Sequence, residues 1–262
     1  MTCSVEEIRL SLPHIELAAH LFGPQDGIPV IALHGWLDNA NSFARLAPRL
    51  EGLRILALDM AGHGHSDHRP PGSAYGLPDY AHDVLQVAGQ MGWERFSLLL
   101  ALIDGLVPPV GEPESVVERM GAALKAQLTQ QSKRKPVYSD MDRAVEARMK
   151  GMVAVSREAA ELLAQRGLMP VPGGYTWRSD SRLTLPSAIR LTRAQALSFV
   201  AAVRCPAYLI VAEEGMLAQN RELLASVPFT VTSLPGGHHL HLNDEAGARS
   251  VADCFNRFFA VP

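Results

Sequence analysis

The chain has 262 residues, of which 47% are hydrophobic and 19% are charged, with a formal net charge of −3. This is the composition of an ordinary globular protein with one large core, and it gives no indication of binding to nucleic acid or to an anionic membrane. The three cysteines are odd in number and widely spaced, which favours a reducing compartment over a disulfide framework. We expect no signal peptide and no membrane span, and therefore a cytoplasmic protein.

Buried strands alternate with helical patterns over the first hundred residues. Apolar and polar residues alternate in two segments around Pro13-His14, which predicts an antiparallel pair. Two short apolar runs are typical of strands buried on both faces. The expected strands are residues 8–12, 15–21, 29–33 and 54–58, and the expected helices are residues 42–50 and 77–91. This alternation predicts an α/β fold with a mostly parallel sheet.

The segment from Phe96 to Gly105 has the pattern of two core strands with nothing between them. Residues 96–99 match one strand, and residues 100–103, closed by Asp104, match the next. Neighbouring parallel strands need a crossover of about a dozen residues or more. The segment is therefore either one long strand or two strands whose crossover is absent, and loss of a crossover helix would leave apolar sheet surface uncovered.

The second half of the chain changes from helices back to strands. Helical patterns dominate residues 107–190, which we interpret as a helical cap inserted between two parts of a core domain, residues 1–106 and 191–262. The expected helices here are residues 116–128, 141–149, 156–166, 193–203 and 245–259, and the expected strands are residues 207–211 and 229–234.

An ordered set of motifs resembles the α/β-hydrolase superfamily. A strand leads into His34-Gly35-Trp36, a second strand leads into Asp59-x-x-Gly62-His63-Gly64-x-Ser66-Asp67, and Gly237-His238 follows the last strand. The segments Trp177–Arg182 and Leu191-Thr192 are similar to the bacterial serine hydrolase-like branch. The resemblance implies an α/β-hydrolase fold with a cap, esterase-like cleavage of an acyl bond in a small molecule, and no cofactor or metal. One motif is missing, because the G-x-S-x-G elbow that should follow residues 96–99 is absent between Leu99 and Leu100.

The resemblance also implies roles for individual residues. His238 corresponds to the general base, and the backbone N–H of Trp36 to one donor of the oxyanion hole. The acid that orients the histidine is either Asp104 or Glu214, since Gly215 occupies the position that many relatives use. The second oxyanion donor normally follows the nucleophile and would be lost with it.

Two other interpretations concern the loop at residues 59–68. The sequence Gly64-His65-Ser66 matches the first half of the G-x-S-x-G motif, but His68 occupies the position of the second glycine. The spacing H-x-H-x-D-H also resembles the zinc signature of the metallo-β-lactamase superfamily. That alternative would use His63, His65, Asp67 and His68 as ligands. The hydrolase loop accounts for the same residues together with Asp59 and Gly62, so we prefer it.

The missing elbow leaves three possibilities open. In the first, the sequence as given omits residues that the protein contains, and the protein is an esterase-like hydrolase. In the second, the deletion is real and the chain is a non-catalytic relative that keeps a pocket as a binding module. In the third, a partner or a rearranged helix covers the sheet in place of the lost helix. The retained His238 and the Trp36 turn favour the first of these.

Overall fold

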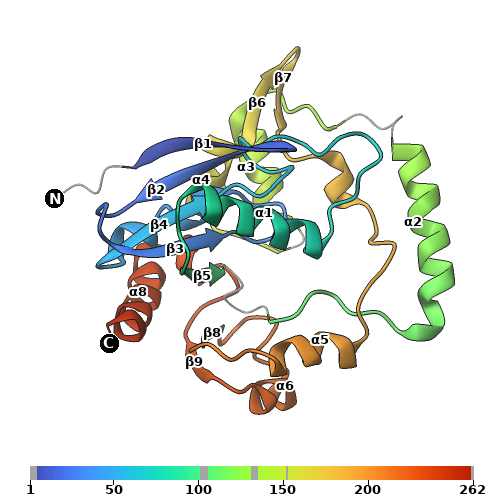
Figure 1. Ribbon diagram of the computed structural model, residues 1–262. Coiled ribbons are helices and arrows are strands. Elements are labelled where there is room, and N and C mark those ends of the chain that lie inside the picture. The colour runs from blue at the N-terminus through green and yellow to red at the C-terminus, as the bar shows by residue number, and fades with distance from the viewer. Residues whose placement is uncertain (1–4, 101–105, 131–134, 152, 261–262) are drawn as a thin grey trace. The chain divides into compact units, whose positions relative to one another are not determined.

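The computed structural model describes residues 5–100, 106–130, 135–151 and 153–260, which belong to two compact units (Figure 1). The first unit comprises residues 1–101, 135–183 and 239–262, and the second comprises residues 102–134 and 184–238. The expected cap, residues 107–190, contributes segments to both units, and its boundaries stay a prediction.

The first unit is built on a five-stranded sheet in the order β1-β2-β4-β3-β5. Its strands are β1 (Glu6–Leu12), β2 (Ile15–Phe22), β3 (Ile28–Leu33), β4 (Leu53–Leu58) and β5 (Ser97–Leu100). The pairs β1–β2 and β2–β4 are antiparallel, whereas β3 runs parallel to both β4 and β5. The expected antiparallel pair at the N-terminus is therefore confirmed, as is the parallel arrangement of the buried strands after it.

Helices and one small hairpin complete the first unit. They are α1 (Leu77–Gln90), α3 (Met141–Met149), α4 (Arg157–Gly167), the hairpin β6 (Leu168–Val171) and β7 (Gly174–Trp177), α7 (Leu240–Asn243) and α8 (Glu245–Phe259), with short 3₁₀ turns η1 (Ala40–Phe43) and η2 (Ala47–Arg49). A further 3₁₀ turn, η4 (Ser181–Thr184), ends at the boundary between the units.

The second unit contains a parallel two-stranded sheet. Its elements are η3 (Pro113–Ser115), α2 (Val116–Gln130), α5 (Arg193–Ala201), β8 (Tyr208–Ala212), α6 (Arg221–Ser226) and β9 (Thr230–Leu234). Leu209 and Val211 of β8 pack with Leu217 and Leu223 in a small core of their own. The helix expected at residues 193–203 is confirmed, and Thr192 caps it by accepting a hydrogen bond from the Gln195 N–H.

Two expectations about local structure are wrong. The single helix expected at residues 42–50 is divided into η1 and η2, because Pro48 lies in the first turn of η2 and cannot donate the backbone bond that would continue a helix. The β6–β7 hairpin was not expected. Its turn is marked in the sequence by Pro172-Gly173, and Gly173 has a φ of +91° that suits glycine.

Strand β5 has one covered face and one exposed face. The apolar side of α1, including Val84 and Val87, packs on the sheet face that carries Ile31. Leu98 is paired with Ile31 in the parallel ladder, so both side chains point to that same face. Ile31 is fully buried, whereas Leu98 is 52% exposed, and Leu99, on the opposite face, is 3% exposed.

The exposed face of β5 lies where a further crossover helix would pack. The connection from β4 to β5 is a crossover that places α1 on one face of the sheet. Crossovers of this kind are right-handed, so a second crossover that continued past β5 in the same direction would place its helix on the same face as α1. Leu98 and Leu100, which is 40% exposed, are the side chains that such a helix would cover. Strand β5 continues from Leu99 to Leu100 without an elbow, so the position at which the family has its elbow lies inside a single strand here.

This asymmetry predicts different costs for two neighbouring substitutions. We expect Leu99→Ala to lower the free energy of unfolding by about 2–5 kcal/mol, because it leaves a cavity in the core. Leu98→Ala should cost less than about 1 kcal/mol, because its side chain already contacts solvent. Urea denaturation of both variants provides the measurement. Equal losses would mean that a helix or a partner covers Leu98.

Candidate functional site

Asp59, directly after β4, organises the loop that follows it. Its side chain is completely buried and accepts hydrogen bonds from the backbone N–H groups of Ala40 and His65, each at 2.7 Å. The Arg166 guanidinium of α4 donates to the same carboxylate through Nε, also at 2.7 Å. A buried carboxylate needs such neutralising partners, and here they join three separate segments of the first unit.

Gly64 is required by the close approach of the loop to Asp59. Its φ is +50°, and a Cβ added at this position would lie 2.3 Å from the Asp59 carboxylate. Any other residue would combine an unfavourable backbone conformation with a clash against a buried ion pair. This contact gives the physical reason for the second glycine of the Gly62-His63-Gly64 motif.

Two buried histidines, His34 and His63, support the turn after β3. The Nδ1 atom of His34 lies 2.8 Å from the Gly35 carbonyl and that of His63 lies 3.1 Å from the Ala61 carbonyl, so in each ring Nδ1 is the donor. Each Nε2 then accepts a backbone N–H, from Met60 at 3.1 Å and from Leu37 at 3.3 Å respectively. These bonds fix both imidazoles in their neutral form.

Burial is the main reason why these imidazoles stay neutral. It lowers the pKa of His34 below its usual value, and burial together with the nearby His34 lowers the pKa of His63 to about 3. The two ring centroids are 4.8 Å apart, so a charge on one ring would also disfavour a charge on the other. Neither histidine is protonated near neutral pH, and both act as fixed hydrogen-bonding groups.

The turn that carries Trp36 has an unusual backbone. Leu37 has a φ of +67°, the only positive φ among the described residues other than glycine. Such a conformation is unfavourable for leucine, and the bond from its N–H to His63 holds it in place. Trp36 itself is 48% exposed, and its indole Nε1 donates to the Leu183 carbonyl at 3.0 Å.

Asp38, at the end of this turn, is the centre of a second buried network. Its Oδ1 accepts a bond from Arg148 of α3 at 2.8 Å, and its Oδ2 lies 3.2 Å from His239 Nε2. Burial alone would raise the pKa of the Asp38 carboxyl, but the His239 hydrogen bond and the Arg148 charge hold this pKa well below its usual range. The network was missed in the sequence, because it joins residues that are 110 and 201 positions apart.

The four residues proposed for catalysis are distributed over the two units, and one of them lies outside the described residues. Trp36 belongs to the first unit, whereas Glu214 and His238 belong to the second. Strands β8 and β9 end side by side, and the Glu214 N–H donates to the Gly236 carbonyl at 3.0 Å, so the loops that carry Glu214 and His238 leave the same edge of this small sheet. His238 is half-buried and Glu214 is exposed. Asp104 lies outside the described residues, and all four roles stay predictions.

Comparison with known proteins identifies the family to which the chain belongs. A family model described as the alpha/beta hydrolase fold matches residues 28–100. The structure of the hypothetical protein PA1622 from Pseudomonas aeruginosa PAO1 is 62% identical, with a TM-score of 0.95, over 97% of this chain and 99% of that one. The serine hydrolase-like protein of Danio rerio is 27% identical, over 97% of this chain and 89% of its own length. The chain belongs to the α/β-hydrolase superfamily, in its serine hydrolase-like branch.

A solved hydrolase of much lower identity shares the fold. The thioesterase domain from the curacin biosynthetic pathway is 20% identical with a TM-score of 0.78, over 96% of this chain. Such a likeness supports the α/β-hydrolase architecture, and it carries no information about the substrate of this chain. Within the described residues, no helix has the length and apolar character needed to cross a bilayer.

The zebrafish relative is longer than this chain in the region they share. Their alignment extends over 292 residues, although the chain has only 262, so the relative contains segments with no counterpart here. The match to the hydrolase family model ends at residue 100, immediately after the Leu99–Leu100 join.

The geometry gives Ser66 a structural role in the loop after β4. Its hydroxyl donates to the Asp59 carbonyl at 2.6 Å and accepts from the Ala18 N–H at 2.8 Å. These two bonds tie the loop after β4 to strand β2. The hydroxyl hydrogen is therefore directed to a backbone carbonyl, which does not suit a nucleophile that must give its proton to a histidine.

The zinc alternative for the same loop is not supported, because its four side chains point to different partners. His63 contacts the backbone as described above, and His65 Nδ1 lies 2.8 Å from Glu7. The Asp67 carboxylate accepts the Glu16 N–H at 3.3 Å, and His68 Nε2 lies 2.9 Å from the Arg178 carbonyl. In the part of the chain that the structure describes, these residues do not form a cluster able to hold a metal ion. Regular spacing in the sequence did not predict the direction of the side chains.

The buried Asp59–Arg166 pair leads to a prediction about stability. Asp59→Asn should lower the free energy of unfolding by about 3–5 kcal/mol, because it removes the buried counterion of Arg166 and leaves that charge only the half-exposed Glu7 carboxylate, 3.3 Å away. Asp67→Asn is the matched control, since Asp67 is exposed and should cost less than about 1 kcal/mol. Guanidinium denaturation of both variants measures the difference. A loss for Asp59→Asn no larger than that of the control would contradict this role.

His63 leads to a prediction about pH. Its pKa is about 3 in the folded chain and near 6.5 when unfolded, so between these values only the unfolded state binds the proton, and stability falls as pH falls. At pH 5 this contribution amounts to about 2 kcal/mol. His63→Gln should reduce the loss of stability between pH 7 and pH 5 by about this amount. Urea unfolding at both pH values, followed by tryptophan fluorescence, tests it, and an unchanged loss would show that His63 titrates normally.

Proposed function

We propose that this chain has the site of a serine hydrolase for a carboxylic ester or similar acyl bond of a small molecule, and that the chain does not complete that site by itself. One observation carries the proposal: strand β5 runs through Leu99–Leu100 at the point where a hydrolase of this family needs its nucleophile elbow. Membership of the serine hydrolase-like branch supports the type of chemistry, and the intact turn after β3 supports the retention of the site.

The proposed mechanism assigns one step to each group. A serine on an elbow after β5 would attack the acyl carbon, while His238 takes the serine proton and then returns it to the leaving group. Asp104 or Glu214 would orient the imidazole and stabilise its charged form. The Trp36 backbone N–H would donate to the oxyanion, together with an N–H that the elbow itself supplies.

The Asp38 network holds the residue that follows the proposed base His238. His239, the next residue, is held by Asp38, and Asp38 is held in turn by Arg148 of α3. This anchor fixes the chain immediately after His238 and connects it to the turn that carries Trp36. The proposed cap, residues 107–190, would select among esters, thioesters and lactones.

A second candidate function is a binding module derived from such a hydrolase. The same absence of an elbow favours it, since a chain without a nucleophile can keep the ligand site and lose turnover. The two candidates predict the same behaviour for the chain as it is, but they differ once an elbow is supplied.

The test compares the chain with a variant that carries an elbow. The chain itself should neither hydrolyse a short-chain aryl ester nor react with an organophosphonate. Insertion after Leu99 of a G-x-S-x-G turn, a helix and a return loop, on the order of twenty residues, should produce labelling and turnover. The same insertion with alanine in place of the serine should be inactive, as should the inserted chain with His238→Ala.

Two outcomes would contradict the proposal. Labelling and turnover by the unmodified chain would mean that a nucleophile exists elsewhere. A folded inserted chain that binds a non-hydrolysable ester analogue but shows no turnover would favour the binding module.

A further inference from the structure

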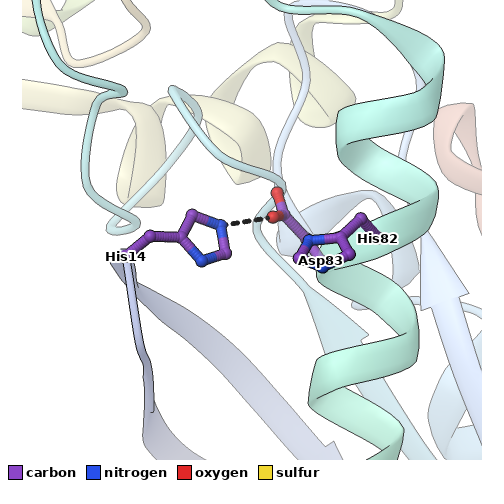
Figure 2. Close-up of side chains that lie close together, drawn as sticks. All are labelled: His14, His82 and Asp83. Carbon is purple, nitrogen blue, oxygen red and sulfur yellow. Dashed lines mark hydrogen bonds and ion pairs between the residues drawn. The ribbon is translucent and has the colours of Figure 1, made fainter.

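A group of three side chains with metal-binding chemistry lies away from the proposed hydrolase site. His14 comes from the turn between β1 and β2, whereas His82 and Asp83 come from α1 (Figure 2). His14 Nε2 lies 3.0 Å from Asp83 Oδ1, and the three possible ligand atoms all lie within 4.8 Å of one another. Two imidazoles and one carboxylate form a ligand set that zinc sites commonly use.

The Asp83 carboxylate is held so that one oxygen faces the two histidines. Its Oδ2 accepts a bond from Arg69 Nη2 at 2.6 Å, and both side chains are buried. The Arg69 guanidinium is placed in turn over the rings of Tyr75 and Tyr80, 5.9 and 5.6 Å from their centroids. A ligating carboxylate is typically oriented by a hydrogen bond to its other oxygen, and Arg69 supplies that bond here.

The distances suit a tetrahedral ion after small side-chain rotations. Zinc bonds of the usual length place neighbouring ligand atoms about 3.3–3.5 Å apart, which lies between the 3.0 Å contact of His14 with Asp83 and the 4.8 Å within which all three ligand atoms lie. His14 and His82 are both exposed, so their rings can adjust without disturbing the core. The contact of His82 with the Gln86 amide, at 3.2 Å, is also exposed and can be exchanged for a metal bond.

We propose that His14, His82 and Asp83 bind a divalent transition metal ion, with Zn²⁺ the best match, and that the ion fastens the β1–β2 turn to helix α1. Imidazole ligands favour zinc over calcium or magnesium, which prefer oxygen. Because the two histidines are exposed, the fourth position is open to water or to a small ligand. The ion stabilises the folded state because the unfolded chain does not hold the three ligands together.

The experiment uses the full chain without a histidine tag, freed of metal by a chelator and titrated with Zn²⁺ in a calorimeter. We expect about one ion per chain, and we expect the thermal midpoint of the wild type to rise with Zn²⁺. His14→Asn and His82→Asn should each weaken binding at least about tenfold and abolish the thermal shift, while leaving the metal-free midpoint nearly unchanged. His68→Asn is the matched control, an exposed histidine from the rival H-x-H-x-D-H segment, and it should bind like the wild type.

Three results would overturn the proposal. They are the absence of stoichiometric binding by the wild type, binding that survives both His14→Asn and His82→Asn, and binding that His68→Asn weakens as much as they do.

Discussion

The buried pair of Asp59 and Arg166 is the interaction on which the first unit depends. The carboxylate follows β4, the guanidinium comes from α4, and the two residues are 107 positions apart in the sequence. A buried charge that loses its partner costs far more than the intact pair contributes, so every neighbour must adapt to it. The loop after β4 does so by presenting the His65 N–H to the carboxylate and by placing glycine at position 64.

Asp38 repeats this arrangement on the neighbouring strand. It follows β3 as Asp59 follows β4, and β3 and β4 are parallel, so the two carboxylates leave the same edge of the sheet. Each accepts a bond from an arginine of the segment 135–183, Arg148 on α3 and Arg166 on α4. Two ion pairs with buried carboxylates therefore fasten this helical segment to the carboxyl edge of the sheet. The same edge carries the turn of Trp36 and the anchor of His239.

The sequence predicted those features that depend on local periodicity. The strands of the five-stranded sheet and helices α1, α3 and α8 lie within one or two residues of their expected bounds, because each is marked by apolar spacing or by a cap. The buried ion pairs and the group at His14 could not be predicted, since they join residues far apart in the chain and depend on the direction of each side chain. The H-x-H-x-D-H segment shows the same limit, because its regular spacing directs four side chains to four different partners.

Strand β5 connects the question of activity to the question of stability. In this fold the residues that carry the nucleophile continue into a helix that covers the sheet, so one segment supplies both the reactive group and the cover for Leu98 and Leu100. Full burial of a leucine side chain is worth about 1.5–3 kcal/mol, so a chain without the segment loses stabilisation as well as chemistry. Exposed apolar side chains on an edge strand also favour association with another chain. The exposed face of β5 is therefore the place where the loss of one segment affects the stability of the chain as well as its chemistry.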